Sequence, residues 1–553
     1  MVGRPDRRQR RLSALFAVGA VLLLVGVLAL SDDGGEGDSS ALATGETPTT
    51  TTSDPADGGA DDDPADGGAA DDANADDDGA DGDEADSDTA DGSGVDGTGV
   101  EGKTTGAPEY PGWVDPASSG EPWGDTVEGL LTFRGNPTRT DYGEGPVPAA
   151  PEVQWRFPAD STMCSSSSVG GESKVWCGTG WTGQPSVFER DGRTWVTFGA
   201  YSSDVHFLDA DTGERIIDDF PTGDIIKGSV TIDPDGYPLL YTGSRDNFYR
   251  VLAFDGTAPR ELWKLSADAV SPTMWNNDWD SAGLVIDDYL FIGGENSQFH
   301  IVKLNRGYDE AGLVTVAPEL VFNAPGWDEE LLNAVGNNVS IENSVAISGD
   351  VVYFANSGGL VQGWDIADLA EGGTPERVFR YWAGDDVDAT IVIDEEGMLY
   401  VAAEYERGTA RSQELGQILK LDPSRPDDPL VWGVDQQRGI DTGIWATPAL
   451  HEDLVIIATD DGRVVGLDRT TGAERWVFEP VGGKLWQSPV IVDDVLIMGD
   501  CEGFLRGYDV SDTSVAPPEL WEVELGGCIE STPAVWRGRI IVGTRAGQVF
   551  GLG

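Results

Sequence analysis

The residue types best suited to bind a ligand recur at one position of a repeated pattern, immediately before a short apolar stretch. They are Trp181, Gln184, Lys227, Trp279, Asp280, Glu342, Asn343, Asp388, Trp445, Trp486, Gln487 and Glu530. Carboxylate and amide oxygens can hold a divalent cation, and aromatic rings can stack on a flat or sugar-like ligand. The alternative is that these tryptophans pack between repeats and that the carboxylates reflect a generally acidic chain.

Other catalytic arrangements have little support in the sequence. His206, His300 and His451 lie in or beside strands of different repeats, which gives no basis for a Ser-His-Asp triad or a zinc site. The glycine-rich piece 178–183 opens no helix and is better interpreted as turns than as a phosphate-binding loop.

The repeated pattern is clearest at residues 459–478. Val464, Val465 and Leu467 form a strand, a polar turn ends at Gly472, and Trp476 begins the next strand. Strands of this kind end at Asp209, Asp255, Asn305, Asp365, Asp422, Asp468, Asp509 and Gly553. Their separations of about 41 to 60 residues are typical of blades or solenoid turns.

Each copy contains two further apolar strands before this one and a fourth strand after the turn. The fourth strand often carries a tryptophan, as at Trp263, Trp432, Trp476 and Trp521. Four antiparallel strands, repeated eight times, predict an all-β fold: an eight-bladed β-propeller. The last copy has three strands, and residues 152–157 have the fourth-strand pattern alone, so we expect them to complete the final blade.

The propeller is expected to span residues 150–553, after a lead-in segment at 108–149. Arginines in residues 1–11 precede an apolar run at 12–30, long enough for a transmembrane helix that leaves the basic segment in the cytoplasm and the propeller outside. The alternative is cleavage after Ser31, which would release a secreted form. Residues 31–107 are acidic and poor in large apolar side chains, which predicts a disordered linker.

The charge of the chain excludes one class of partner. The formal net charge is −63, and a field of this sign repels phosphate groups. Nucleic acid is therefore not an expected partner.

The turn Asp-x-x-Thr-Gly-x-x-x-Trp, clearest within residues 204–215, 460–478 and 500–523, resembles the repeat of the pyrroloquinoline-quinone (PQQ) propeller superfamily. Residues 131–139, Leu-Thr-Phe-Arg-Gly-Asn-Pro-Thr-Arg, followed by 145–148, are similar to the lead-in of exported bacterial PQQ-binding-like propellers. The superfamily includes quinoprotein alcohol dehydrogenases and outer-membrane-assembly propeller lipoproteins. The resemblance therefore implies an eight-bladed fold more specifically than a function.

Four cysteines in an exported chain predict two disulfides, for which three pairings exist. In an up-and-down blade, the loop entering the first strand and the turn between the second and third strands lie on one face. This topology favours Cys164 with Cys177 and Cys501 with Cys528. The alternative, a metal cluster, lacks close Cys-x-x-Cys spacing and nearby histidine.

Resemblance to the dehydrogenases implies a funnel that binds calcium and PQQ. There Glu342, Asn343 and Asp388 would supply calcium ligands, and Trp445 or Trp486 would be the quinone platform. Those enzymes typically have a disulfide between adjacent cysteines, and no two cysteines here are adjacent.

We therefore expect a non-catalytic, cofactor-free binding or scaffolding propeller of the bacterial cell envelope, with an envelope protein, a small molecule or a carbohydrate as its ligand. The alternative is a PQQ- and calcium-dependent dehydrogenase that oxidises an alcohol or a sugar at the funnel.

Overall fold

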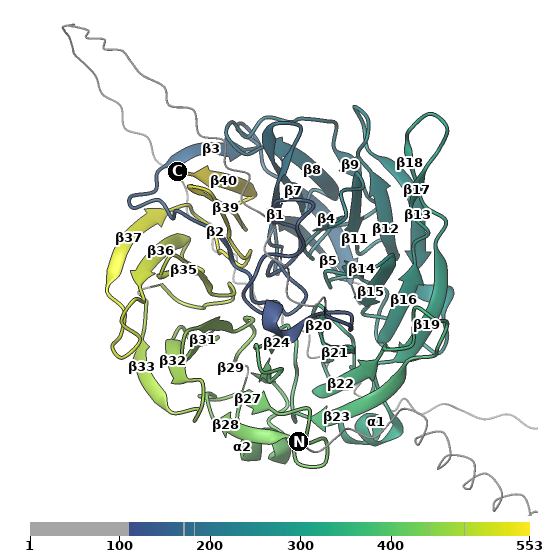
Figure 1. Ribbon diagram of the computed structural model, residues 1–553. Coiled ribbons are helices and arrows are strands. Elements are labelled where there is room, and N and C mark those ends of the chain that lie inside the picture. The colour runs from purple at the N-terminus through teal and green to yellow at the C-terminus, as the bar shows by residue number, and fades with distance from the viewer. Residues whose placement is uncertain (1–109, 170–171, 182, 441, 481) are drawn as a thin grey trace, which may run out of the picture. The chain divides into compact units, whose positions relative to one another are not determined.

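The computed structural model describes residues 110–553, except 170, 171, 182, 441 and 481. These residues form a ring of eight β-sheets around an axis, which confirms the predicted eight-bladed propeller (Figure 1). Successive strands within each blade pair antiparallel. The residues that precede each first strand therefore lie at one end of the ring, here called the funnel end.

The first four blades contain, in chain order, β6 (Ser186–Arg190), β7 (Arg193–Gly199), β8 (Asp204–Asp209) and β9 (Phe220–Pro221); β10 (Thr231–Ile232), β11 (Leu239–Thr242), β12 (Phe248–Ala253) and β13 (Arg260–Ser266); β14 (Leu284–Ile286), β15 (Tyr289–Gly293), β16 (Gln298–Lys303) and β19 (Glu319–Pro325); and β20 (Ala346–Ser348), β21 (Val351–Phe354), β22 (Leu360–Asp365) and β23 (Glu376–Trp382).

The other four contain β24 (Val392–Ile393), β25 (Leu399–Ala402), β27 (Ile418–Leu421) and β28 (Leu430–Val434); β30 (Ala449–His451), β31 (Leu454–Ala458), β32 (Val464–Asp468) and β33 (Glu474–Phe478); β34 (Val490–Val492), β35 (Val495–Gly499), β36 (Phe504–Asp509) and β37 (Glu519–Glu524); and β38 (Ala534–Trp536), β39 (Arg539–Thr544) and β40 (Gln548–Leu552), with β3 (Val153–Phe157) as its outer strand.

The shorter elements lie in the connections and near the axis. They are β1 (Gly129–Leu130), β2 (Gly143–Glu144), the hairpin β4 (Cys164–Val169) and β5 (Glu172–Cys177), the hairpin β17 (Gly307–Tyr308) and β18 (Val314–Thr315), the pair β26 (Glu404–Tyr405) and β29 (Thr442–Gly443), the helices α1 (Glu329–Val335) and α2 (Ala410–Leu415), and the 3-10 turns η2 (Pro116–Ser118) and η3 (Ala267–Ala269).

A glycine in the third strand makes room for the fourth-strand tryptophan. Gly466 pairs with Trp476, and a Cβ on Gly466 would stand 2.2 Å from the indole ring. Gly507 has the same relation to Trp521, where that distance would be 2.3 Å. The buried indole therefore lies flat across its own blade.

The repeated Thr-Gly turn joins neighbouring blades. Gly472, at φ 72°, lies against the ring of Trp432 in the preceding blade, where a Cβ would approach the indole to 2.8 Å. The indole N–H of Trp432 donates to the carbonyl of Arg469 at 3.3 Å. Trp476 donates in the same way to Thr513 of the next blade, at 3.2 Å. The motif that is clearest in the sequence is thus an inter-blade contact.

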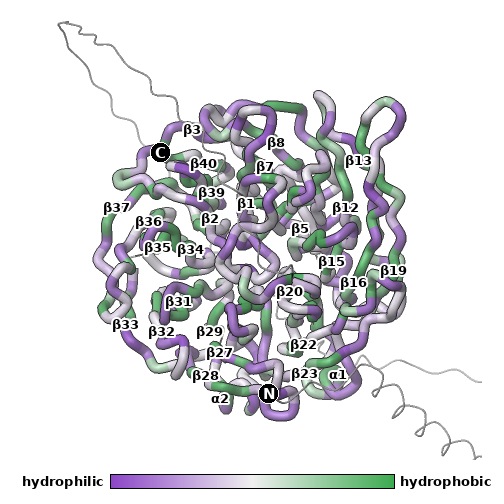
Figure 2. Tube along the Cα trace, viewed as in Figure 1, coloured by the Kyte–Doolittle hydropathy of each residue, from purple (hydrophilic) through white to green (hydrophobic). Residues whose placement is uncertain are grey.

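The core consists of apolar side chains between adjacent blades, and Figure 2 shows the apolar residues concentrated along the strands. One continuous cluster includes Ile456, Ile497 and Val542, which come from the last three blades and are fully buried. Stacking of blades thus buries surface that a single four-stranded sheet would leave exposed.

Strand β3 completes the final blade as expected. It pairs antiparallel with β40, so that Phe157 lies opposite Val549. The indole N–H of Trp155 donates to the carbonyl of Ala210 in the first blade at 2.8 Å. The N-terminal strand therefore closes the ring.

Residues 129–147, here called the axial segment, run through the centre of the ring (Figure 1). Strand β1 pairs with β6 of the first blade, and β2 pairs in parallel with β38 of the last blade. Between them, the carbonyls of Leu131, Pro137 and Thr138 accept hydrogen bonds from Ile232, Ile347 and Ile393 at 2.8, 2.8 and 3.0 Å.

Two fully buried arginines of the axial segment bind carbonyls of further blades. Arg134 donates to Pro489 and Thr447, each at 2.6 Å. Arg139 donates to Val345 at 2.8 Å and to Ala282 at 3.1 Å. Together with the backbone contacts, these bonds connect the axial segment to every blade.

Among the described residues, none of the helices is long and apolar enough to cross a membrane. The expected transmembrane helix at 12–30 and the acidic linker at 31–107 lie outside the described residues and stay predictions.

Candidate functional site

Lys227 and Asp280 belong to a buried charged cluster at the funnel end of the second and third blades. The Lys227 Nζ lies 2.5 Å from Asp280, 3.4 Å from Glu295 and 3.7 Å from Asp278. Arg245 also pairs with Asp278, at 2.7 Å. Burial raises the pKa of Glu295 to about 7, even though Lys227 opposes this shift. In this cluster two cations neutralise most of the charge on three carboxylates.

Glu342 and Asp388 belong to a second cluster, which also contains Asp386 and Glu404. One carboxylate oxygen from each of Asp386, Asp388 and Glu404 lies within 4.8 Å of the others. Glu342 accepts a hydrogen bond from Ser340 at 2.6 Å. Burial, and next the Asp388 carboxylate, raise the pKa of Glu342 to about 8. We call Glu342, Asp386, Asp388 and Glu404 the acidic cluster.

Three tryptophans stand beside the acidic cluster. Trp181 stacks on Trp445, with ring centroids 5.3 Å apart and planes 14° apart. Trp486 meets Trp445 edge to face at 5.0 Å. The indole N–H of Trp445 donates to Asp388 at 3.2 Å, which joins the aromatic group to the carboxylates. The indole N–H of Trp486 donates to Asp460.

The side chains of Gln184 and Asn343 are hydrogen-bonded to the backbone. Gln184 donates to the carbonyl of Pro533 at 2.8 Å and accepts the N–H of Arg134 at 2.7 Å. Asn343 donates to Val387 at 2.7 Å and accepts the N–H of Ala355 at 3.1 Å. The amide oxygen assigned to calcium in the sequence-based alternative is therefore engaged with the backbone.

The remaining predicted residues are also held by the fold. Gln487 accepts the N–H of Gly499. Trp279 is buried against Tyr249 and His300. Glu530 forms an ion pair with Arg545 at 2.9 Å, on the side of the ring closed by the last blade.

Sequence reasoning missed Arg245, Glu295, Glu404 and Arg407. All four lie in the connection between the second and third strands of a blade, and this connection is at the funnel end of the ring. The rule that placed Cys501 at this end would have found them too, had it been applied to charged residues.

Both disulfides join the expected pairs. Cys164 and Cys177 close the β4–β5 hairpin, and Cys501 is joined to Cys528. The hairpin carries Trp176, whose ring lies 5.4 Å from the guanidinium of Arg245 and 5.1 Å from that of Arg545. The first disulfide therefore belongs to a hairpin anchored on the funnel by cation–π contacts.

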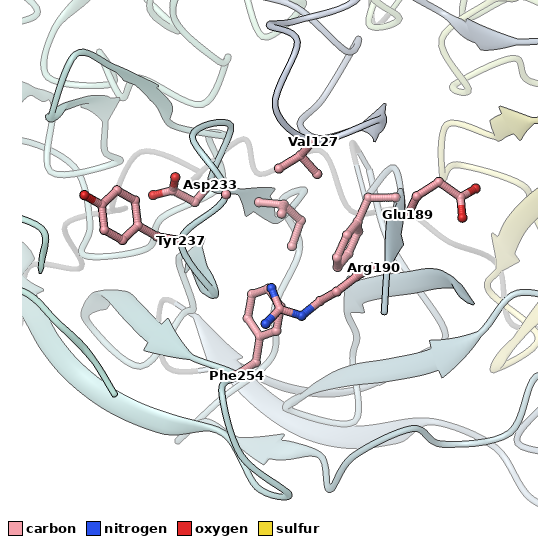
Figure 3. Close-up of a pocket in the computed structure, with 9 residues that line it drawn as sticks. Val127, Glu189, Arg190, Asp233, Tyr237 and Phe254 are labelled. Carbon is pink, nitrogen blue, oxygen red and sulfur yellow. The ribbon is translucent and has the colours of Figure 1, made fainter. Parts of the chain in front are cut away.

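A small pocket lies at the opposite ends of the first strands of blades one and two. Figure 3 shows Arg190 pointing toward Phe254, with Asp233, Tyr237 and Val127 around the opening. Its volume is about 40 Å³. Ligand pockets usually enclose roughly 300–1,000 Å³, so this pocket has room for water rather than for a cofactor.

The funnel residues fit PQQ poorly. PQQ is a flat tricarboxylate and needs an exposed aromatic face and unpaired cations. Trp181 covers one face of Trp445, and Lys227 and Arg245 are paired with Asp278 and Asp280. The carboxylates of the acidic cluster would repel such a ligand.

A family model described as outer membrane protein assembly factor BamB matches residues 414–553. Among curated proteins, BamB of Salmonella typhimurium is 25% identical over 168 residues, or 30% of this chain and 37% of that protein. BamB of Kangiella koreensis is 35% identical over 99 residues, or 17% and 24%. The chain therefore matches well under half the length of either relative.

Solved quinohemoprotein alcohol dehydrogenases have a similar fold. The enzyme from Comamonas testosteroni gives a TM-score of 0.50 at 14% identity, over 77% of this chain and 80% of that one. ADHIIG from Pseudomonas putida HK5 gives 0.52 at 11% identity, with the same coverages. At these identities the likeness is one of fold alone.

Proposed function

We propose that this chain, whose fold and repeats are those of the PQQ-type propellers, is a non-catalytic binding or scaffolding protein of the cell envelope. The observation that carries the proposal is the state of the funnel. Its tryptophans and cations are engaged with other side chains of the chain, while the carboxylates of the acidic cluster outnumber the cations that pair with them. Such a funnel suits recognition of a partner better than the holding of a quinone.

Two observations support a location in the cell envelope: the names of the matched relatives and the presence of disulfides. The matched relatives are outer membrane assembly factors, and two disulfides suit an oxidising compartment outside the cytoplasm. In this proposal the segment 12–30 anchors the propeller to the membrane and the acidic linker separates the two. The expected partner is an envelope protein or a small molecule.

Cell fractionation tests the location. The full chain should be found in the membrane fraction, and protease added to cells stripped of their outer layers should degrade the propeller. Replacing residues 12–30 by the same length of linker sequence should leave the protein in the cytoplasm. Protection of the unaltered propeller from external protease would contradict the proposal.

The second candidate is a PQQ-dependent dehydrogenase, and the observation in its favour is the hydrogen bond from Trp445 to Asp388 beside Glu342. Titration of the purified protein with PQQ and Ca²⁺ separates the two functions. We expect no quinone binding at micromolar PQQ. A stoichiometric quinone spectrum together with dye-linked oxidation of an alcohol would replace the scaffold by the enzyme.

A further inference from the structure

The two charged clusters of the funnel differ in how their charge is balanced. In the first cluster, Lys227 and Arg245 lie among Asp278, Asp280 and Glu295. In the acidic cluster, Arg407 forms an ion pair with Asp386 at 3.4 Å and shares its guanidinium with Asp385, which lies outside the cluster, at 3.5 Å. The acidic cluster therefore contains more acidic groups than cations to pair with them.

One member of the acidic cluster has an unused acceptor. Asp386 is only 5% exposed, and its Oδ1 accepts no hydrogen bond from any described residue. A buried carboxylate oxygen without a donor is costly, because desolvation is not offset by a hydrogen bond. A donor or a cation supplied from outside the chain would remove this cost.

The tryptophans beside the cluster favour one kind of cation. The stacked pair of Trp181 and Trp445 is tied to Asp388 through the Trp445 N–H. An indole face attracts ammonium and guanidinium groups and offers apolar surface to the methylene groups that carry them. It provides no oxygen ligand for a metal ion such as Ca²⁺.

The chain already holds its own cations in this way at the same end of the ring. The Lys484 Nζ lies 4.8 Å from the centroid of Trp486 and 3.9 Å from Asp460. Arg545 lies 5.1 Å from Trp176 while it pairs with Glu530. Each of these two cations contacts an aromatic face and a carboxylate at the same time.

We propose that the acidic cluster and Trp445 bind an organic cation, namely a primary ammonium or guanidinium group on an alkyl chain. The group would lie among Glu342, Asp388 and Glu404, donate to Asp386 Oδ1, and pack its methylene groups on the face of Trp445 opposite to Trp181. This inference rests on the proposed binding function and gives its ligand a chemical class. The group can come from a Lys or Arg side chain of a partner protein or from a free amine.

Calorimetry on the full chain in detergent, with tryptophan fluorescence as a second signal, tests the proposal. The peptide probe is N-acetylated and C-amidated Gly-Gly-Arg-Gly-Gly, its neutral control is the same capped peptide with citrulline for arginine, and the free probe is agmatine. We expect the arginine peptide or agmatine to bind at least about tenfold more tightly than the citrulline peptide. Tighter binding of the peptide identifies a protein side chain as the source, and tighter binding of agmatine identifies a free amine.

Variants locate the binding. Glu342→Gln with Asp388→Asn should weaken binding about tenfold or more and reduce its salt dependence. Glu395→Gln is the matched control, because Glu395 belongs to an acidic group that lies next to Arg469, after a first strand and away from the funnel. It should leave binding unchanged.

Three outcomes would overturn the proposal. They are equal affinity for the arginine and citrulline peptides, absence of binding of both cationic probes to the unaltered chain, and binding of Ca²⁺ that neither probe competes with. None of these affects the location measured by fractionation. Quinone binding, by contrast, would remove the proposed scaffold function itself.

Discussion

Arg134 shows how a single side chain can hold the centre of the ring. It is fully buried, and its guanidinium donates to carbonyls of the sixth and seventh blades. A lysine has a single compact ammonium group, which lacks the planar pair of nitrogens that Arg134 extends to carbonyls of two blades. Burial without these partners would be costly.

We therefore expect Arg134→Lys to lower the free energy of unfolding by about 2–4 kcal/mol. The measurement is urea denaturation followed by tryptophan fluorescence. Arg156→Lys, at an exposed position of β3, is the control and should change stability by less than about 0.5 kcal/mol. Equal stability of the two variants would show that the planar guanidinium of Arg134 does not contribute to the free energy of unfolding.

The carboxylates of the funnel predict a pH dependence. Burial and Asp388 raise the pKa of Glu342 to about 8 in the folded state, above its ordinary value of 4.5. Between these two values the folded chain binds more protons than the unfolded chain. The contribution of Glu342 to the free energy of unfolding is therefore complete below about pH 4.5. This contribution is lost as the pH rises toward 8.

Urea denaturation between pH 5 and 8 measures this effect. We expect the free energy of unfolding to fall with rising pH, and Glu342→Gln to make that decline shallower because glutamine does not titrate. Glu396→Gln, which changes an exposed residue, serves as the control. A variant with the slope of the unaltered protein would assign the pH dependence to other groups, of which Glu295 is one.

At the scale of one blade, the third and fourth strands depend on the pairing of a glycine with a tryptophan. An alanine at position 466 would bring its Cβ to 2.2 Å from the ring of Trp476. The ring would have to move away from the contact that it makes with Thr513 of the next blade.

Gly466→Ala should therefore destabilise the propeller by about 1–3 kcal/mol through overpacking. Thermal unfolding is the readout. Gly256→Ala provides the comparison, because a Cβ there would meet its nearest neighbour at 3.8 Å. Rescue of Gly466→Ala by Trp476→Leu would show that the collision is the cause.

Blade architecture could be predicted because its signals are local and repeated. The turn at 468–472 and the tryptophan at 476 recur with a period, and a strand without partners at 152–157 matched a blade that lacked one. The role of Gly466 as space for that tryptophan is a contact across two strands. It became apparent only from the register.

The funnel was harder to predict, because its charged side chains come from two kinds of connection within the blades. Sequence position placed Asp280 and Asp388 at the correct end, but Glu295 and Glu404 come from the connections after second strands. Asn343 has a residue type suited to metal binding, yet its side chain bonds the backbone of its own and the next blade. Which groups pair, and which stay in excess, depends on distances between blades that no local pattern contains.

At the scale of the whole molecule, closure by β3 makes stability a property of the complete ring. Deletion of residues 150–158 removes the outer strand of the last blade and the contact of Trp155 with the first blade. The blades would then have an open edge and one missing interface.

We expect this deletion to abolish cooperative thermal unfolding of the whole propeller, measured by calorimetry. Deletion of residues 60–68, an equal length of the acidic linker, should leave the transition in place. An unchanged melting temperature after removal of 150–158 would refute closure by this strand.

The axial segment determines when the molecule can become complete. Residues of this segment are synthesised before any blade, yet Arg134 donates to the carbonyl of Pro489, 355 residues later in the chain. The segment therefore cannot reach its final position until nearly all of the chain has been synthesised. Contacts over such distances in sequence form slowly. The ring is then completed in a single late step rather than blade by blade. A chain whose synthesis stops early lacks the contacts of the axial segment, and quality-control proteases can recognise such a chain.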